Sequence, residues 1–230
     1  MKIIAKTFYI LTCAIATFYM VVSFIPNIII SPYSRLFLLC SACLTVYLGG
    51  MFHTKGMELE KKVDIMKRVF SVIFLFYLIL ITTLVLFDAY FGRVGHMGLW
   101  QWNKELLSAY VSNSMNLIPF ATVGEYVMAM INGTMNAEII FINLAGNLFA
   151  FSPLGFFLPL LFKKQKHLGI FIGTTTVIVC SVEIMQFVTL VGSCDIDDLI
   201  LNVLGAVCAY GILHIPLIKN VIRKITFLEY

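Results

Sequence analysis

One stretch of the chain, SVEIMQFVTLVGSCDIDDLILNVLG, concentrates side chains that could do chemistry. It spans Ser181 to Gly205 and holds four carboxylates and two amides: Glu183, Asp195, Asp197, Asp198, Gln186 and Asn202. Such groups can serve as general acids or bases, as oxygen ligands for a hard divalent cation, or as hydrogen-bonding contacts between helices. The choice among these roles depends on the elements that hold them.

The composition excludes a soluble globular domain. Hydrophobic residues make up 60% of the 230 residues, charged residues only 12%, and the mean hydropathy is +0.96, whereas globular chains are near half apolar and a quarter charged. The basic residues are scattered in short segments without the clustering that nucleic-acid binding needs, and the six cysteines show no metal or redox spacing. We predict an all-α, polytopic membrane protein.

Six membrane-spanning helices are predicted at residues 5–26, 35–52, 69–91, 139–162, 168–190 and 199–218. The first is expected to be an uncleaved span, because its apolar run is too long for a signal peptide. The fourth is predicted to be kinked by Gly146, Pro153, Gly155 and Pro159. Residues 1–68 are interpreted as an N-terminal two-helix extension and residues 69–230 as the main transmembrane domain.

Lysine and arginine predict the orientation. If the spans alternate, thirteen of the 16 basic residues fall on one side of the membrane and three on the other. Positive charge marks the cytoplasmic face, so both termini are expected inside. The carboxylates of the loops before the fourth and sixth spans, and Asp88 at the end of the third, then face outward. In the long third loop, Trp100 and Trp102 predict a helix lying in the headgroup layer.

Depth along the spans predicts a shared polar pocket. Glu183 lies about seven residues from the outer end of its span, roughly 10 Å at 1.5 Å per residue. Asn143 and Asn147 in the fourth span, Gln186 in the fifth, and Asp198 and Asn202 in the sixth have comparable depths. A carboxylate within a span almost always faces the bundle interior or water. We therefore expect one outward-facing acidic pocket.

Four ordered motifs carry a family resemblance. NLIPF (116–120), Asn147-x-x-x-Phe-x-Pro-x-Gly (147–155), EIMQF (183–187) and DIDDLILNVLG (195–205) resemble the VanZ-like family of small bacterial membrane proteins. The resemblance covers residues 116–212 and implies a role in low-level resistance to teicoplanin, a lipid-tailed glycopeptide. It points to Asn116, Asn147, Glu183, Gln186, Asp195, Asp198 and Asn202.

The chain departs from the family pattern at two places. Many relatives carry an arginine shortly before the aspartates, but residues 187–194 contain no basic residue, and position 152 is serine where an aliphatic residue is more usual. The missing cation leaves the carboxylates less compensated. This slightly favours a metal or a cationic ligand over an internally paired network.

The individual residues have competing interpretations. A divalent cation is not favoured, because no spacing is diagnostic of a metal site and DIDD (195–198) is also a good helix N-cap. Asp197 or Asp198 would lie beside free backbone N–H groups of the sixth span, and capping is the better explanation for one of the three aspartates. The amides of Asn143, Asn147 and Asn202 also suit contacts between helices, and NLIPF suits a structural turn. For Glu183, a functional role is preferred, since a hydrogen bond between membrane helices contributes only about 1 kcal/mol.

Two functions of different classes follow. In the first, the chain is a non-catalytic envelope protein that limits lipoglycopeptide action through the pocket. In the second, it is an enzyme acting on a lipid-linked substrate. The candidate catalytic residues are Glu183, Asp195 and Asp198, and the candidate substrate-binding residues are Asn116, Asn143, Asn147, Gln186 and Asn202. The expected partners are membrane lipids and a lipid-linked envelope molecule or lipoglycopeptide, and no cofactor is expected. A transporter is disfavoured because the halves show no repeat.

Overall fold

The structure is a computed structural model that describes residues 1–24, 30–86 and 103–230. Within these ranges the chain is almost entirely helical, which confirms the all-α prediction. Six helical segments are long and apolar enough to cross a membrane: Lys2–Ser23, Pro32–Thr54, Leu59–Leu86, Ala137–Leu161, Leu168–Thr189 and Ile196–Leu213. The chain is therefore a multi-pass membrane protein. Asp88, Trp100 and Trp102, for which the sequence predicted positions, lie outside the described residues.

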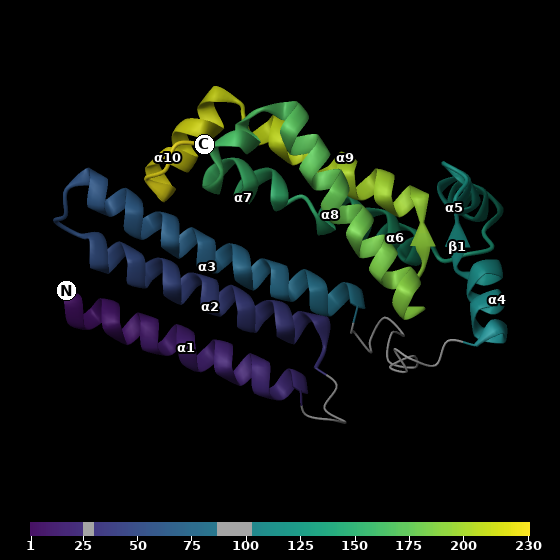
Figure 1. The fold of residues 1–230 in the computed structure, drawn as a ribbon, viewed down its shortest axis with the longest axis horizontal. Coiled ribbons are helices and arrows are strands. Elements are labelled where there is room, and N and C mark those ends of the chain that lie inside the picture. The colour runs from purple at the N-terminus through teal and green to yellow at the C-terminus, as the bar shows by residue number, and fades with distance from the viewer. Residues whose placement is uncertain (25–29, 87–102) are drawn as a thin grey trace. The chain divides into compact units, whose positions relative to one another are not determined.

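The chain forms two compact units, one of residues 1–92 with 219–230 and the other of residues 93–218. The first contains three long helices, α1 (Lys2–Phe24), α2 (Pro32–Thr54) and α3 (Leu59–Leu86), which lie side by side in Figure 1. Their apolar core includes Tyr19, Leu39, Ala42 and Phe76. The division of the chain into an N-terminal extension (1–68) and a main transmembrane domain (69–230) stays a prediction.

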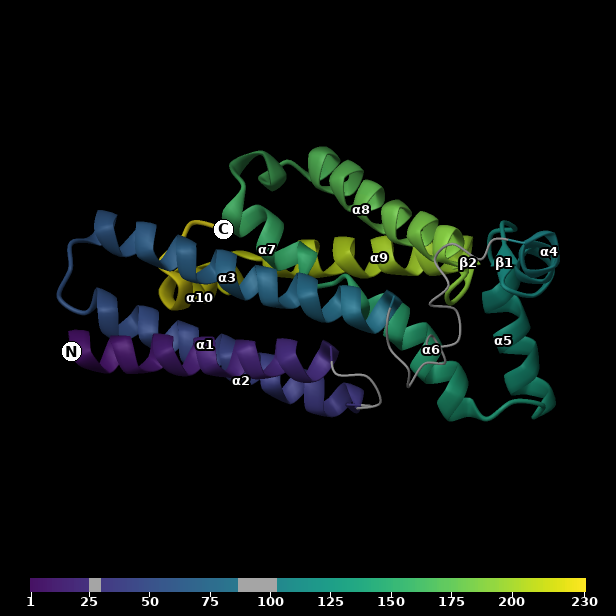
Figure 2. The same ribbon diagram turned by 60° about the horizontal axis from the view of Figure 1, so that its bottom comes forward.

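The second unit holds the shorter elements and the last three spans. In chain order they are α4 (Lys104–Asn113), β1 (Met115–Asn116), α5 (Ala121–Asn132), α6 (Ala137–Ala150), α7 (Leu154–Leu161), the 3-10 turn η2 (Lys163–Lys166), α8 (Leu168–Thr189), β2 (Cys194–Asp195) and α9 (Ile196–Leu213). A last helix, α10 (Pro216–Thr226), follows. Helix α9 contacts α6, α7 and α8 and lies between α8 and α6 in Figure 2.

The fourth span is broken, as predicted, between α6 and α7. Residues 151–153 interrupt the helix, because Pro153 has no backbone N–H to donate to the preceding turn. The hydroxyl of Ser152 donates to the Leu148 carbonyl at 2.9 Å and so satisfies one acceptor that the break would otherwise leave open. The serine that departs from the family pattern thus has a local structural role.

Two glycines let the broken span approach α9 closely. A Cβ on Gly155 would lie 2.6 Å from the backbone nitrogen of Tyr210 and 2.7 Å from the carbonyl oxygen of Ala206. A Cβ on Gly205 would overlap the carbonyl of Leu148. Because backbone meets backbone at both points, no side chain can move aside, and only glycine fits. This contact sets the spacing of the helices that carry Asn147 and Asp198.

Candidate functional site

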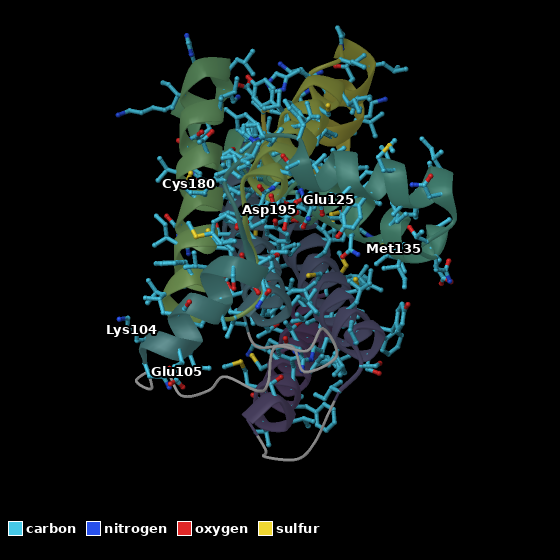
Figure 3. The ribbon with its side chains drawn as sticks, turned by 90° about the vertical axis from the view of Figure 1, so that its right-hand side faces the viewer. Lys104, Glu105, Glu125, Met135, Cys180 and Asp195 are labelled. Atoms are coloured by element: carbon cyan, nitrogen blue, oxygen red, sulfur yellow. The ribbon has the colours of Figure 1, made fainter. Side chains whose placement is uncertain are left out.

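A short parallel strand pair brings the predicted motifs together. Met115 pairs with Cys194 and Asn116 with Asp195, and the backbone N–H of Cys194 donates to the Ser114 carbonyl at 2.9 Å. The pairing joins the segment before α5 to the segment between α8 and α9. Residues almost eighty positions apart in the sequence therefore meet where α9 begins. Figure 2 shows β1 and β2 at this point, and Figure 3 labels Asp195 there.

Asp195 is hydrogen-bonded to several elements of this acidic cluster. Its Oδ1 accepts from the backbone N–H of Asp197 at 2.8 Å, which makes it the N-cap of α9. The side-chain amide of Asn116 donates to Oδ1 at 3.0 Å, and the hydroxyl of Thr122 donates to Oδ2 at 2.5 Å. Its backbone N–H donates to Oε2 of Glu183 at 3.2 Å. One aspartate thus links β1, α5, α8 and α9.

Asp197 belongs to α9 but caps a different helix. Its Oδ1 accepts from the backbone N–H of Phe120 at 2.5 Å, and its Oδ2 accepts from the backbone N–H of Val123 at 3.0 Å. The N-cap residue of α5, Phe120, has φ 65° and no side-chain cap of its own. A carboxylate is favourable at a helix N-terminus, because the free N–H groups there carry partial positive charge. Asp197, only 1% exposed, therefore holds α5 in place.

The NLIPF segment forms the turn that presents Phe120 to this carboxylate. The backbone N–H of Ile118 donates to the side-chain oxygen of Asn116 at 2.9 Å, an Asx turn that bends the chain after β1. The backbone N–H of Ala121 then donates to the Ile118 carbonyl at 3.2 Å. The interpretation of NLIPF as a structural turn is confirmed.

Asp198 contacts the broken span, and Asn202 is buried further along α9. Asp198 Oδ1 accepts a hydrogen bond from the side-chain amide of Asn147 in α6. Asn202 lies one helical turn after Asp198, on the same face of α9. It is 4% exposed, and its side-chain oxygen is buried without a hydrogen-bond partner among the described residues. Amide and carboxylate groups therefore extend from the loop into the membrane-spanning part of the unit.

The electrostatics around the cluster are strongly negative. No lysine or arginine occurs in residues 105–162 or 168–218. Burial raises the pKa of the Tyr126 hydroxyl, and the charges of Asp198, Asp195 and Glu125 raise it further. Burial likewise raises the pKa of the Cys194 thiol, with added contributions from Glu183 and Asp195. An anion here is disfavoured, whereas a cation or a hydrogen-bond donor would gain energy.

Comparison with known proteins places these motifs in a family. The profile described as VanZ/LLP1 matches residues 74–219, which include all four motifs and every element of the cluster. The chain belongs to the VanZ/LLP1 family. No curated protein and no solved structure matches it.

The cluster at the start of α9 contains most of the site residues that were predicted from the sequence. Hydrogen bonds of the described residues tie Asn116, Glu183, Asp195, Asn147 and Asp198 to its elements. Gln186 and Asn202 are buried on α8 and α9 at 5% and 4% exposure. Asn143 is different: it is exposed, and its amide donates to the Ile139 carbonyl of its own helix at 2.9 Å. The roles assigned to these residues stay predictions.

Two features of the cluster were not foreseen. Capping of the sixth span by one of the three aspartates was expected and is confirmed, since the side chain of Asp195 caps α9. That Asp197 caps α5 instead was not foreseen. Thr122, which bonds both Asn116 and Asp195, was not singled out because an isolated threonine carries no sequence signal. In the described parts of the chain, no group of three His, Cys, Asp or Glu residues is arranged to hold a metal ion.

Proposed function

We propose that this VanZ/LLP1 protein is a binding protein of the bacterial cell envelope that lowers susceptibility to teicoplanin and related lipoglycopeptides. The observation that carries the proposal is that Glu183 of α8 and Asn147 of α6 both hydrogen-bond at the start of α9, the first to the backbone of Asp195 and the second to Asp198. A buried carboxylate inside a span is costly and marks a functional site by default. The ligand that such groups favour is cationic or rich in hydroxyl groups.

The hydrogen bonds support different roles for the four carboxylates, two structural and two in ligand binding. Asp195 and Asp197 accept from donors in neighbouring elements and hold the segments of the cluster together. Glu183 lies in α8 and Asp198 in α9, and two amides accompany them, Asn147 in α6 and Asn202 in α9. These four residues would contact the ligand in the expected acidic pocket, and Asp195 would position them.

The orientation is part of the proposal. The distribution of lysine and arginine supports cytoplasmic termini and a cluster that opens outward. In a variant whose only cysteine is Cys194, a membrane-impermeant maleimide should label intact cells. A single cysteine introduced as Gln165→Cys, between α7 and α8, should be labelled only after permeabilisation. The reverse pattern would overturn an extracytoplasmic site.

The function is tested by complementing a deletion strain. Wild-type protein, Glu183→Gln and Asp198→Asn would be compared for teicoplanin and vancomycin susceptibility at equal membrane levels. Glu138→Gln is the matched control, because Glu138 is an exposed carboxylate in the first turn of α6. The proposal requires that the first two variants restore less resistance than wild type while the control restores it fully. If deletion itself leaves teicoplanin susceptibility unchanged, the proposed role is wrong.

The burial of Glu183 favours a second candidate, an enzyme that acts on a lipid-linked or headgroup substrate. Glu183 is 8% exposed, and an acid or base shielded from water can transfer a proton at a positioned substrate atom. Glu183→Gln is almost isosteric but cannot exchange a proton. It should therefore abolish an enzymatic function and only weaken a binding function, so a graded response across drug concentrations supports binding.

A further inference from the structure

Helix α10 is strongly amphipathic, and only half of its apolar face is used within the protein. Ile222 and Thr226 are buried, whereas Leu217, Val221 and Ile225 are 74%, 48% and 50% exposed. The exposed three are spaced by four residues and form one stripe along the helix. The stripe thus presents apolar surface that the described residues leave uncovered.

Basic residues border this stripe. Lys219, Arg223 and Lys224 occupy the remaining face of α10, and no acidic residue occurs between positions 216 and 226. An apolar stripe flanked by lysine and arginine is the pattern of a helix that lies in the membrane interface, with its apolar side among the acyl chains and its charges among the headgroups.

The position of α10 in the chain suits this placement. Two residues separate it from α9, whose 18 residues run from the acidic cluster across the membrane. At 1.5 Å per residue, α9 is about 27 Å long, close to the thickness of the hydrocarbon core. Helix α10 therefore starts at the membrane face opposite the cluster. Its 11 residues are too few to cross back.

The C-terminal part of α10 belongs to the first unit and contacts its other helices. The ammonium group of Lys62 lies 3.5 Å from the centroid of the Phe227 ring, and the hydroxyl of Tyr47 donates to the Ile225 carbonyl at 3.1 Å. The start of α1 belongs to the same end, because Tyr9 contacts His53 at 3.4 Å. Residues 1–6, 55–68 and 219–230 together hold ten Lys and Arg against four Asp and Glu.

From these observations we infer that α10 is an interfacial helix that binds anionic phospholipid headgroups on the face opposite the acidic cluster. Lys219, Arg223 and Lys224 would contact the phosphates, and Leu217, Val221 and Ile225 would enter the acyl layer. The excess of positive charge selects an anionic lipid over a zwitterionic one. This inference does not depend on the ligand of the cluster.

Hydrogen–deuterium exchange tests the inference on the full chain in nanodiscs. One set of discs contains phosphatidylcholine alone, and the other contains phosphatidylcholine with phosphatidylglycerol. Residues 216–226 should exchange at least about tenfold more slowly with phosphatidylglycerol, since each basic residue beside an anionic surface contributes roughly a factor of five. Equal exchange in the two lipids would overturn the inference, as would fast exchange in both.

Two triple variants identify the residues responsible. Lys219→Gln with Arg223→Gln and Lys224→Gln should abolish the dependence on phosphatidylglycerol. Lys163→Gln with Lys164→Gln and Lys166→Gln removes the same charge from η2 and should leave the protection of α10 intact. If both triples reduce protection equally, overall charge rather than α10 attracts the lipid, and the inference fails.

Discussion

The carboxylate of Asp197 provides the sharpest test of how the cluster is built. It accepts hydrogen bonds from the backbone N–H groups of Phe120 and Val123, although it lies 74 residues further along the chain than Val123. Removing it by Asp197→Ala leaves the N-terminus of α5 without these acceptors. We expect α5 to open locally while the six membrane-spanning helices stay folded.

The size of the effect follows from the hydrogen bonds that are lost. A hydrogen bond to a charged group contributes about 1.5–3 kcal/mol, so two contribute about 3–6 kcal/mol before water is considered. Phe120 is 66% exposed, so water can replace part of the loss, and we expect about 2–4 kcal/mol. This corresponds to a rise of roughly 30- to 1,000-fold in the opening of α5. Asp197→Asn keeps an acceptor oxygen but loses the charge, and should cost about 1 kcal/mol.

Hydrogen–deuterium exchange of residues 118–131 in the detergent-solubilised chain measures this opening directly. Glu138→Ala is the control, since it removes an exposed carboxylate from the first turn of the next helix, α6. The expected order of exchange rates is Asp197→Ala, then Asp197→Asn, then the control and wild type together. If Asp197→Ala exchanges within about threefold of the control, a cost below 1 kcal/mol is indicated. The capping argument would then be refuted.

Three further outcomes are expected from the same geometry. Gly205→Ala should destabilise the α6–α9 contact by at least about 3 kcal/mol, whereas Gly211→Ala, where a Cβ meets nothing within 4 Å, should not; thermal unfolding in detergent compares them. Thr122→Val should cost about 1–2 kcal/mol by the same measurement, and Thr122→Ser should recover the loss by restoring the hydroxyl. Because burial first, and then the charges of Glu183 and Asp195, raise the Cys194 pKa, its alkylation rate should continue to rise with pH above the usual thiol range. Neutralising one of those charges by Glu183→Gln should move the profile to lower pH, and an unchanged profile would contradict the proximity of the two groups.

The sequence was sufficient to predict the architecture of the membrane part. Six spans, the break near Pro153 and the placement of carboxylates near the ends of helices all follow from local properties. Apolar length, proline chemistry and the cost of burying charge act through neighbouring residues or through the solvent. These features can therefore be predicted from the sequence without knowing which helices are in contact.

The tertiary structure decided which carboxylate does what. Asp195, Asp197 and Asp198 are close in sequence, yet the first caps α9, the second caps α5, and the third accepts a hydrogen bond from Asn147. On the first turn of a helix, adjacent positions point in directions about 100° apart. Each aspartate therefore meets a different neighbour, and only the packing of α5, α6 and α8 around α9 determines its role.

Asn143 also shows what the sequence alone could not predict. Its spacing of four from Asn147 places both residues on one face of α6, and on that ground both were expected in the cluster. The structure instead turns Asn143 outward to its own backbone, because α9 contacts the part of the span near Leu148, where Gly205 permits close approach. Helical periodicity determines which side chains share a face, whereas the crossing point of two helices determines which of them are buried.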